Sequence, residues 1–513
     1  MTVAGLQKII ADHNPGVPPA YGKENHPHPV VLIIGGGYSG AALAIRLLEQ
    51  RRNNMRIVIA EPRSVLGGGQ AYSTADKAQL MNGPAGNFSI HRDNLTHLAD
   101  WVERNSDRHD IVLPPDGASG LFIPRSLFGH YVQEELQHAI RAMDDGVTLE
   151  HWQTQVIRLD RPSAGGRMVA GFADGRSLHA DLVVLATGVF PLATDVGLSS
   201  LANDPRLATP WNEVKLDRLS KANEVLIVGA SLSMVDTVAS LEARGFTGRY
   251  QIISRRGHLI EPVRTAGEAL DIVDQNALPC TARELLALVI SARRKLLAEG
   301  RDWQVIPLSL RPFILRLWQG STTIEQLRFT RHLRSLWDVT LHRAAPPSYA
   351  AVERAMRAGR FTAQAARLVS AELSGEQIEV SLRPRGQRET VTIKVDGIID
   401  ARGHQEHDWS RIKAPLVRHL LENGLVRRHD TGFGIDATTD GGVRDQAGTE
   451  HGDLFAIGHP LRGVAWESSS LTELREQAQM LAAKLDSALR INVNSGQTAA
   501  LSRRLHNAAE AVR

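Results

Sequence analysis

The sequence predicts an α/β fold with two similar parallel-sheet units, the second inserted within the first, and an additional helical insert. An apolar run, a glycine-rich turn, an Ala/Leu-rich helix and a second apolar run follow one another over residues 30–61, and the same order returns over 224–256. Each unit later returns to an apolar run that ends in Ala-x-Gly, at 186–188 and at 401–403. Residues 281–360 show helical spacing and are rich in Leu, Arg and Trp.

The remaining elements follow from apolar spacing and from turn residues such as Gly165-Gly166 and Asp174-Gly175. Helices are expected at 126–143 and 469–492. Strands are expected at 30–34, 56–60, 147–159, 167–172, 177–185, 224–228, 250–253, 377–382, 389–399 and 454–458.

Composition and charge exclude several classes of protein. Hydrophobic residues make up 42% and charged residues 22% of the 513 positions, which is typical of a globular protein. The formal net charge is +3, so no basic surface for nucleic acid is expected. No apolar stretch reaches the roughly 18 residues of a membrane span, and no secretion signal precedes the first strand. Cys280 is the single cysteine, which favours a cytoplasmic location and excludes an internal disulfide.

The first glycine-rich turn predicts a dinucleotide site. In Gly35-x-Gly37-x-x-Gly40, the first glycine permits the tight turn, the second lets the backbone approach a pyrophosphate and the third lets helix and strand pack closely. The helix that begins near Ser39 presents free N–H groups to phosphate. Glu61 ends the next strand and can accept hydrogen bonds from an adenosine ribose. This first unit is therefore a Rossmann-like unit suited to FAD.

The second unit differs where the cofactors differ. Arg255 follows Gly229 at the same sequence offset at which Glu61 follows Gly35, and it lies in the run Ser254-Arg255-Arg256. Guanidinium groups favour a 2′-phosphate, which a carboxylate repels. The second unit is therefore expected to bind NADPH, through Gly229, Ser231, Arg255 and Arg256. The alternative is that these arginines form a solvated edge, and Ser231 and Met234 replace the second and third glycines.

The chain resembles the FAD–NAD(P)-binding family, whose wider relatives are flavin-dependent monooxygenases and disulfide-reductase-like proteins. The resemblance lies in segments along nearly the whole chain: 66–74, 80–85, 123–129, 331–334, 337–339, 342–343, 454–458, 462–463 and 466–468. It implies that Met81, Asn82 and Pro84 line the flavin ring, that Val156 meets the adenine, and that residues 463–470 start a helix aimed at the flavin. Further cofactor contacts are expected at Gln70, Arg125, Gly188, Gly458 and Trp466.

These expectations divide the chain into domains. An N-terminal tail covers 1–28 and a C-terminal tail 493–513. The FAD-binding domain is expected in two parts, at 29–215 and 396–492. The NAD(P)-binding domain lies between them at 216–395 and contains the helical insert, a predicted substrate lid.

The predicted function is an FAD-dependent, NAD(P)H-using oxidoreductase, most simply a monooxygenase that uses O₂ to hydroxylate a small metabolite, which the resemblance suggests is nitrogen-containing. A dehydrogenase or reductase without oxygen insertion and a non-catalytic redox sensor stay open. The flavin-containing monooxygenase signature before the second turn is replaced by Thr209-Pro210-Trp211-Asn212, and the second Ala-Thr-Gly by Ala401-Arg402-Gly403. Both departures argue against a Baeyer–Villiger enzyme.

Candidate catalytic side chains are few. Asn82, His91 and Arg92 follow or belong to the expected flavin-lining segment and are predicted to contact substrate or an anion. His332 and His342 could act as acid–base groups, although such histidines are more often surface or packing residues. No set of ligands at metal spacing surrounds them, so no metal site is expected. The oligomeric state is left open.

Overall fold

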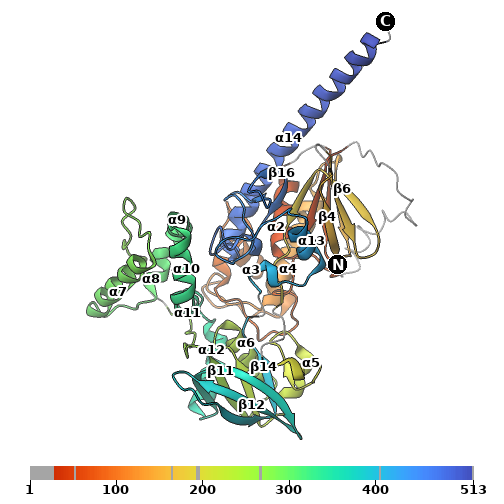
Figure 1. Ribbon diagram of the computed structural model, residues 1–513. Helices are drawn as coiled ribbons and strands as arrows, with labels where there is room; N and C mark the ends of the chain where they lie inside the picture. Colours follow the sequence, from red (N-terminus) through yellow and green to blue (C-terminus); the bar gives the residue numbers. More distant parts are fainter. Residues whose placement is uncertain are drawn as a thin grey trace.

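The computed structural model describes residues 28–50, 54–162, 166–191, 197–264, 268–403 and 406–510, with the backbone alone over 491–510. Most of the expected N-terminal tail, and Gly165 of one expected turn, lie outside these residues. Figure 1 shows two sheet-containing lobes, a helical lobe beside them and a long C-terminal helix that projects from the molecule. None of the described helices combines the length and the apolar character that crossing a bilayer requires.

The first lobe is built on a six-stranded sheet in which the five strands β3, β2, β1, β7 and β16 run parallel and β15 pairs antiparallel at the edge. The bounds are β1 Val30–Ile34, β2 Met55–Ala60, β3 Val147–Trp152, β7 Leu182–Leu185, β15 Gly442–Arg444 and β16 Glu450–Ala456. The strands are largely apolar because both faces of the sheet are covered, as is usual for parallel sheets.

Helices pack on one face of this sheet: α2 (Tyr38–Glu49), α3 (His97–Arg104), α4 (Arg125–Arg141) and α14 (Leu471–Glu510). The other face is covered by α13 (Pro415–Glu422) and by a three-stranded antiparallel sheet of β4 (Val156–Asp160), β5 (Met168–Phe172) and β6 (Ser177–Ala180). The helix predicted at 469–492 is longer in the structure, because α14 continues to Glu510 through most of the expected C-terminal tail.

The second lobe repeats this plan. Its seven-stranded sheet has the order β13-β12-β11-β10-β9-β14-β8. The bounds are β8 Leu207–Ala208, β9 Glu224–Val228, β10 Arg249–Ser254, β11 Phe361–Ser374, β12 Gln377–Pro384, β13 Val391–Val395 and β14 Gly397–Asp400. Since β8 and β14 pair in this sheet, the second unit extends beyond the expected range of 216–395 at both ends. Its helices include α5 (Glu213–Leu219), α6 (Leu232–Ala243) and α12 (Pro346–Arg357).

The helical insert leaves the second sheet after β10 and returns through α12, which packs on α6. It consists of α7 (Ala282–Ala298), α8 (Val305–Leu310), α9 (Ile314–Gly320), α10 (Thr323–His332) and α11 (Arg334–Leu341). A capping box at Thr281 and Glu284 starts α7. Short 3₁₀ turns lie at Ala85–Asn87, Asp107–His109, Ser199–Leu201, Arg311–Phe313, Trp409–Arg411 and His459–Leu461.

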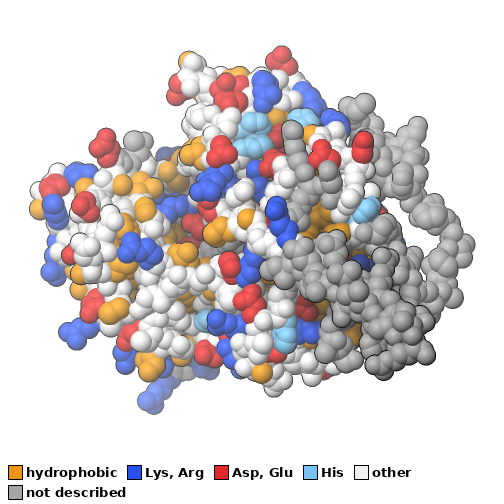
Figure 2. Space-filling model, turned by 90° about the horizontal axis from the view of Figure 1, so that it is seen from above, with side chains coloured by type: hydrophobic (Ala, Val, Ile, Leu, Met, Phe, Trp, Pro, Cys, Tyr) orange, Lys and Arg blue, Asp and Glu red, His pale blue; other side chains and the backbone are white. Residues whose placement is uncertain are grey.

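Acidic and basic side chains are interspersed on the face shown in Figure 2. This distribution agrees with the small net charge of +3. It gives this face no single-sign field of the kind that attracts a polyelectrolyte.

Candidate functional site

The first glycine-rich turn has the geometry that its sequence predicts. Gly35 has a φ of +110°, and a Cβ placed there would lie 2.3 Å from the carbonyl oxygen of Ala186. A Cβ at Gly40 would lie 2.1 Å from the Gly35 oxygen, so that glycine permits close packing of helix and strand. Gly37 is the N-cap residue of α2, and because it has no side chain, no side-chain hydrogen bond occupies the first N–H groups of the helix. The first N–H groups of α2 therefore keep the orientation that binds phosphate at a helix start.

Glu61 and the segment around Gly69 brace this turn. The Glu61 carboxylate is buried and accepts hydrogen bonds from the backbone N–H of Gly36 and of Arg63, both at 3.0 Å. The Gly67 N–H donates to the Gly36 oxygen at 2.7 Å, and a Cβ on Gly37 would lie 3.4 Å from the Gly69 Cα. Two glycine backbones thus face each other at the turn, which leaves no side chain between them.

Other predicted cofactor residues gather at the same carboxyl edge of the sheet. A Cβ on Gly458 would lie 2.9 Å from Ser39 Oγ, so the end of β16 touches the start of α2. Gly188 has open space on its Cα, and the neighbouring Thr187 Oγ1 is buried without a hydrogen-bond partner in the described part of the chain. This edge therefore keeps room and polar groups for a ligand.

The predicted flavin-lining residues are spread over different degrees of burial. Met81 is buried, Asn82 and Pro84 are half-buried, and Gln70 is exposed. Val156 starts β4 on the opposite face of the sheet, where its side chain is buried.

Arg125 lies at the junction between the two lobes. Its guanidinium forms an ion pair with Asp236 of α6 at 2.7 Å and donates to the Leu80 oxygen at 3.2 Å. It also lies 5.5 Å from the centre of the Trp211 ring. The structure therefore shows Arg125 joining the lobes, a contact that the sequence did not reveal.

His91 and Arg92 are adjacent in sequence but contact different elements. His91 Nε2 lies 2.7 Å from Glu135 Oε2 on α4, whereas the exposed Arg92 pairs with Glu476 of α14 at 3.2 Å. Burial opposes ionisation of Glu135, but the hydrogen bond with His91 and the nearby His97 hold the pKa of its carboxyl below the ordinary value. The contacts of His91 thus lie in the helical layer over the first sheet.

The second turn is a structural copy of the first. Gly229 has a φ of +125°, and its Cβ would lie 2.3 Å from the Ala401 oxygen. Ser231 caps α6 from an extended conformation, as Gly37 caps α2, and no side-chain cap is made. Met234, at the position of Gly40, is completely buried.

The strand register corrects one sequence expectation. The Gly35 N–H donates to the Ala60 oxygen, the residue before Glu61, and the Gly229 N–H donates to the Ile253 oxygen. Ser254 therefore occupies the position of Glu61, and Arg255 lies one residue beyond it. The equal sequence offsets predicted the wrong counterpart for Glu61. Ile34 pairs with Ala60 and Val228 pairs with Ile253, so the second unit has one residue fewer between its glycine turn and the end of the next strand.

The two arginines of the second unit have different surroundings. Arg255 is exposed and forms no hydrogen bond or ion pair with another described residue. Arg256 instead donates to the backbone oxygens of Arg331 and His332 at 2.8 and 2.7 Å, at the end of α10. Arg255 is the arginine that is free to meet a phosphate.

A buried group of side chains, the His–Arg cluster, lies between the first lobe and the insert and was missed by sequence reasoning. Its members are His407, His459, Arg334 and Arg462. The two imidazole rings stack with centroids 5.3 Å apart. Burial and the two guanidinium groups lower the pKa of His407 to about 2 and of His459 to about 3, so both rings are neutral. Burial and repulsion from Arg462 lower the pKa of Arg334 to about 10, where it stays charged.

Several donors in this cluster and in the neighbouring Trp466 have no partner among the described residues. Arg334 donates to His407 Nε2 at 2.9 Å, so the proton of the neutral His407 ring is on Nδ1. His407 Nδ1, Arg462 Nε and the indole Nε1 of Trp466 are all buried without an acceptor. Arg462 is only 8% exposed and pairs with no described carboxylate. Since unpaired buried donors and charges are costly, the cluster is built to receive an acceptor-rich or anionic group.

This cluster adjoins the first nucleotide turn, because His459 directly follows Gly458. Its members come from three distant segments that converge only in the fold. One partial signal was present in the sequence, since Arg334, Arg462 and the neighbouring Trp466 belong to segments that carry the family resemblance.

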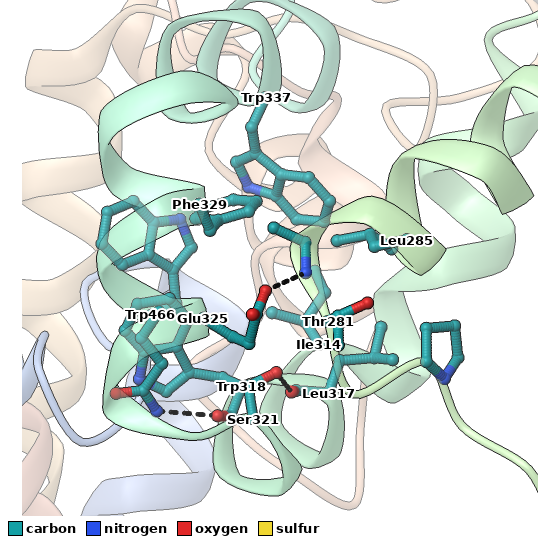
Figure 3. A pocket seen from close by; sticks show the side chains of 13 residues that line it. Thr281, Leu285, Ile314, Leu317, Trp318, Ser321, Glu325, Phe329, Trp337 and Trp466 are labelled. Carbon is teal, nitrogen blue, oxygen red and sulfur yellow. Dashed lines mark hydrogen bonds between the residues drawn. The ribbon is translucent and has the colours of Figure 1, made fainter.

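An apolar pocket lies in the helical insert (Figure 3), and one of its walls is Trp466, whose ring lies 4.8 Å from the Arg462 guanidinium of the cluster. Trp318, Phe329 and Trp337 of the insert line it together with Trp466 of the first lobe. The Trp318 and Trp466 rings are 4.8 Å apart, and Trp318 Nε1 donates to the Gly463 oxygen at 2.6 Å. The helical insert therefore covers this part of the first lobe, as a lid would.

The two histidines predicted in the insert differ. His342 Nε2 lies 3.6 Å from Glu467, whose other carboxylate oxygen accepts from Trp337 Nε1 at 2.9 Å. The His332 side chain is exposed, and its backbone oxygen holds Arg256. Of the two, only His342 lies beside the wall of the pocket.

Comparisons with known proteins agree with this architecture. Residues 32–190 match the model of a family described as FAD-NAD(P)-binding, a stretch that includes the first turn, Glu61 and Gly188. No curated protein matches the chain by sequence.

Solved structures match over nearly the whole chain. The reduced form of ornithine hydroxylase from Pseudomonas aeruginosa is 16% identical, with a TM-score of 0.60 over 90% of this chain and 99% of that one. L-lysine 6-monooxygenase from Pseudomonas syringae is 17% identical, with a TM-score of 0.61 over 90% and 100%. The cadaverine monooxygenase from Erwinia amylovora, bound to FAD, is 12% identical, with a TM-score of 0.59 over 89% and 94%. These matches confirm the predicted fold with two dinucleotide-binding units.

Proposed function

We propose that this protein is an FAD-dependent, NADPH-using monooxygenase that hydroxylates a small nitrogen-containing metabolite in the cytoplasm. The observation that carries the proposal is the His–Arg cluster, whose unpartnered donors lie beside the first nucleotide turn and under the helical insert. The match of residues 32–190 to an FAD-NAD(P)-binding family supports the choice of flavin. The likeness in fold to hydroxylases of ornithine, lysine and cadaverine supports the choice of reaction.

The residues of the first unit fit FAD. The turn from Gly35 to Gly40 and the start of α2 suit the pyrophosphate, and Glu61 suits the adenosine ribose. The donors of His407, Arg462 and Trp466 suit the carbonyl oxygens and the ring nitrogen at the polar edge of an isoalloxazine. When bound, FAD supplies the hydride acceptor and the reaction with O₂. The chain orients it and excludes water through the cluster and the insert.

The second unit fits NADPH. The turn at Gly229 and Ser231 copies the first, and the Arg255 guanidinium, just after β10, has no hydrogen-bond or ion-pair partner among the described residues. Arg255 also lies close enough to Arg334 to lower its pKa, which places the second unit's arginine near the cluster. Transfer of hydride requires that the two cofactor sites meet, and Arg255 is the residue of the second unit that interacts with the cluster.

The lining of the pocket in Figure 3 suits the apolar part of an amine, for which its closed volume of about 40 Å³ would have to widen. Its aromatic walls suit alkyl or aryl carbons, and Glu325 and Glu467 place carboxylates at or beside the wall. Ornithine, lysine and cadaverine, for which the similar structures are named, all carry a primary amine.

The proposal is tested with the purified full-length protein. We expect bound flavin, NADPH oxidation that a panel of diamines and basic amino acids stimulates, and one added oxygen in the product by mass spectrometry. Arg462→Met should lower flavin occupancy and slow reduction by NADPH by about 10- to 100-fold, because a buried charge-assisted bond is lost. The exposed Arg490, which pairs with Asp486 on α14, supplies the control Arg490→Met.

Two results would replace the proposal with another function. NADPH oxidation that yields hydrogen peroxide and no oxygenated product across the panel would favour a reductase. Bound flavin that NADPH leaves oxidised would favour a redox sensor, and a protein without flavin would overturn the proposal altogether.

A further inference from the structure

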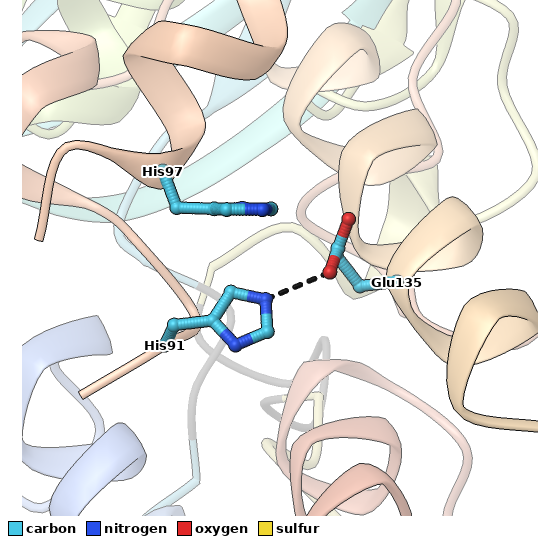
Figure 4. Close-up of side chains that lie close together, drawn as sticks. All are labelled: His91, His97 and Glu135. Carbon is cyan, nitrogen blue, oxygen red and sulfur yellow. Dashed lines mark hydrogen bonds and ion pairs between the residues drawn. The ribbon is translucent and has the colours of Figure 1, made fainter. Parts of the chain in front are cut away.

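Two histidines and a glutamate converge in the helical layer over the first sheet, on α3, α4 and the loop that precedes α3 (Figure 4). His91, His97 and Glu135 each offer one ligand atom, and these atoms all lie within 4.8 Å of one another. The two imidazole rings are 4.3 Å apart in an edge-on arrangement. Figure 4 shows both rings directed toward the Glu135 carboxylate.

Each of the three side chains is held in place by its own element. The backbone N–H of His91 donates to Oγ of the buried Ser89 at 3.0 Å, which fixes the backbone that carries the His91 ring. His97 begins α3, and its Nδ1 lies 3.0 Å from the Tyr131 hydroxyl. Glu135 lies one turn after Tyr131 on α4, with its side chain 6% exposed. The arrangement is therefore preorganised, and Tyr131 fixes the orientation of the His97 ring as an outer-shell partner does in metal sites.

We propose that His91, His97 and Glu135 bind one Zn²⁺ ion. Two imidazoles and one carboxylate form a donor set that zinc accepts in tetrahedral geometry with a fourth position for water. The His91 side chain is 24% exposed, so water can reach that position. Tetrahedral zinc with bond lengths near 2.1 Å needs its donor atoms about 3.4 Å apart. On binding, the hydrogen bond between His91 Nε2 and Glu135 is replaced by bonds to the ion, this pair separates slightly, and the more distant donors approach.

The site joins segments that are separate in sequence, which explains why residue spacing did not predict it. His91 and His97 lie close together in the chain, whereas Glu135 comes from α4, well beyond the end of α3. The loop that carries His91 continues from the segment that contains Met81 and Asn82. Zinc would therefore fasten this segment to α3 and α4.

The proposal predicts one high-affinity zinc ion per full-length protein after treatment with a chelator, measured by isothermal titration calorimetry. His91→Ala and Glu135→Gln should each weaken zinc binding by at least about tenfold. The control is His130→Ala, because His130 also lies on α4 and stacks on another histidine, His109, at 5.5 Å, outside the group of His91, His97 and Glu135. This control should leave zinc affinity unchanged.

A second measurement, on the wild-type protein, does not depend on whether a variant folds. Co²⁺ added in place of zinc should give the intense visible bands of a tetrahedral site in the wild type, and Glu135→Gln should lose them. Unchanged stoichiometry and affinity in both ligand variants would overturn the proposal, as would a wild-type cobalt spectrum of the weak, fully hydrated kind. Neither result depends on flavin or NADPH, so this site is tested separately from the proposed function.

Discussion

Gly35 illustrates how closely one residue is constrained at the first turn. Its φ of +110° is unfavourable for a residue with a side chain, and its Cα faces the Ala186 oxygen. We expect Gly35→Ala to lower the free energy of unfolding by about 2–4 kcal/mol, from backbone strain and overpacking together. Urea unfolding measures this loss, and the absorbance ratio of flavin to protein should fall in parallel.

Gly359→Ala is the matched control for this change. Gly359 also has a positive φ, +67°, but open space surrounds its Cα at the end of α12. Gly359→Ala should therefore lower the free energy of unfolding only by the backbone strain, roughly 1 kcal/mol. Equal losses in the two variants would show that contact with Ala186 is not what makes Gly35 necessary.

The neutral histidines of the His–Arg cluster predict a stability that falls with acid. In the unfolded chain an imidazole binds its proton below about pH 6.5, whereas His459 in the folded protein does so only at about pH 3. Between these values the unfolded state binds more protons, so stability is present above pH 6.5 and is lost as the pH falls. Protonation of His459 in the unfolded state should by itself lower the free energy of unfolding by about 2 kcal/mol between pH 7 and pH 5.

The measurement compares urea unfolding of the wild type and His459→Gln at pH 7 and pH 5. The variant should lose less stability on acidification, because glutamine does not titrate. If the wild type and His459→Gln lose equal stability, the imidazole is not held neutral.

At the scale of single residues, sequence patterns predicted the parts of the site that act through the backbone. Gly35, Gly37 and Gly40 were predictable because a tight turn at a helix start needs glycine at fixed spacing. His407, His459 and Arg334 were not, because no local pattern links them and only tertiary packing places them together. Their unpaired donors can be recognised only in the folded structure, where the donor atoms are buried without an acceptor.

At the scale of elements, the strand–turn–helix–strand unit was predicted twice, and the structure contains it twice. What the sequence offset could not predict was the register of β10 against β9, because the pairing can shift by one residue without changing the apolar pattern. The consequence concerns specificity: Ser254 takes the place of Glu61, and the neighbouring Arg255 carries the charge.

This register predicts a difference between the two arginines of the second unit. Arg255→Ala should raise the KM for NADPH about 10- to 100-fold and leave kcat/KM for NADH nearly unchanged, because only NADPH carries the 2′-phosphate. Arg256→Ala should change the preference between the two nucleotides much less, since Arg256 holds the end of α10 instead. Steady-state kinetics with both nucleotides measures the preference. An unchanged preference in Arg255→Ala would mean that this side chain is only a solvated surface residue and does not contact the 2′-phosphate.

At the scale of the whole molecule, two sheet lobes are joined by a small number of polar contacts. Arg125 of the first lobe pairs with Asp236, and Arg244 of the second lobe pairs with Asp76 at 2.6 Å. Gln79 Nε2 also donates to the Pro210 oxygen at 2.9 Å. The order of the lobes in the chain was predictable from the returning glycine pattern. The junction was not, because its charged residues look like ordinary surface residues in sequence.

The Arg125–Asp236 pair predicts a strong coupling between the lobes. Its side chains are only 14% and 8% exposed, so removal of one partner leaves the other charge buried and alone. Arg125→Met and Asp236→Leu should each lower the free energy of unfolding by about 3–5 kcal/mol. The double variant should lose clearly less than both single losses together, because no unpaired charge is left. A double-mutant cycle by urea unfolding measures the difference, provided that the lobes unfold in one transition.

The exposed pair of Arg176 and Asp174, 2.8 Å apart in the first lobe, is the control. Both of its side chains are 38% exposed, so the coupling energy of that pair should stay below about 1 kcal/mol. A coupling at Arg125 and Asp236 as small as at this exposed pair would show that solvent reaches the junction. The two lobes would then be held together mainly by the helical insert, whose Trp318 and Trp337 donate hydrogen bonds to the first lobe.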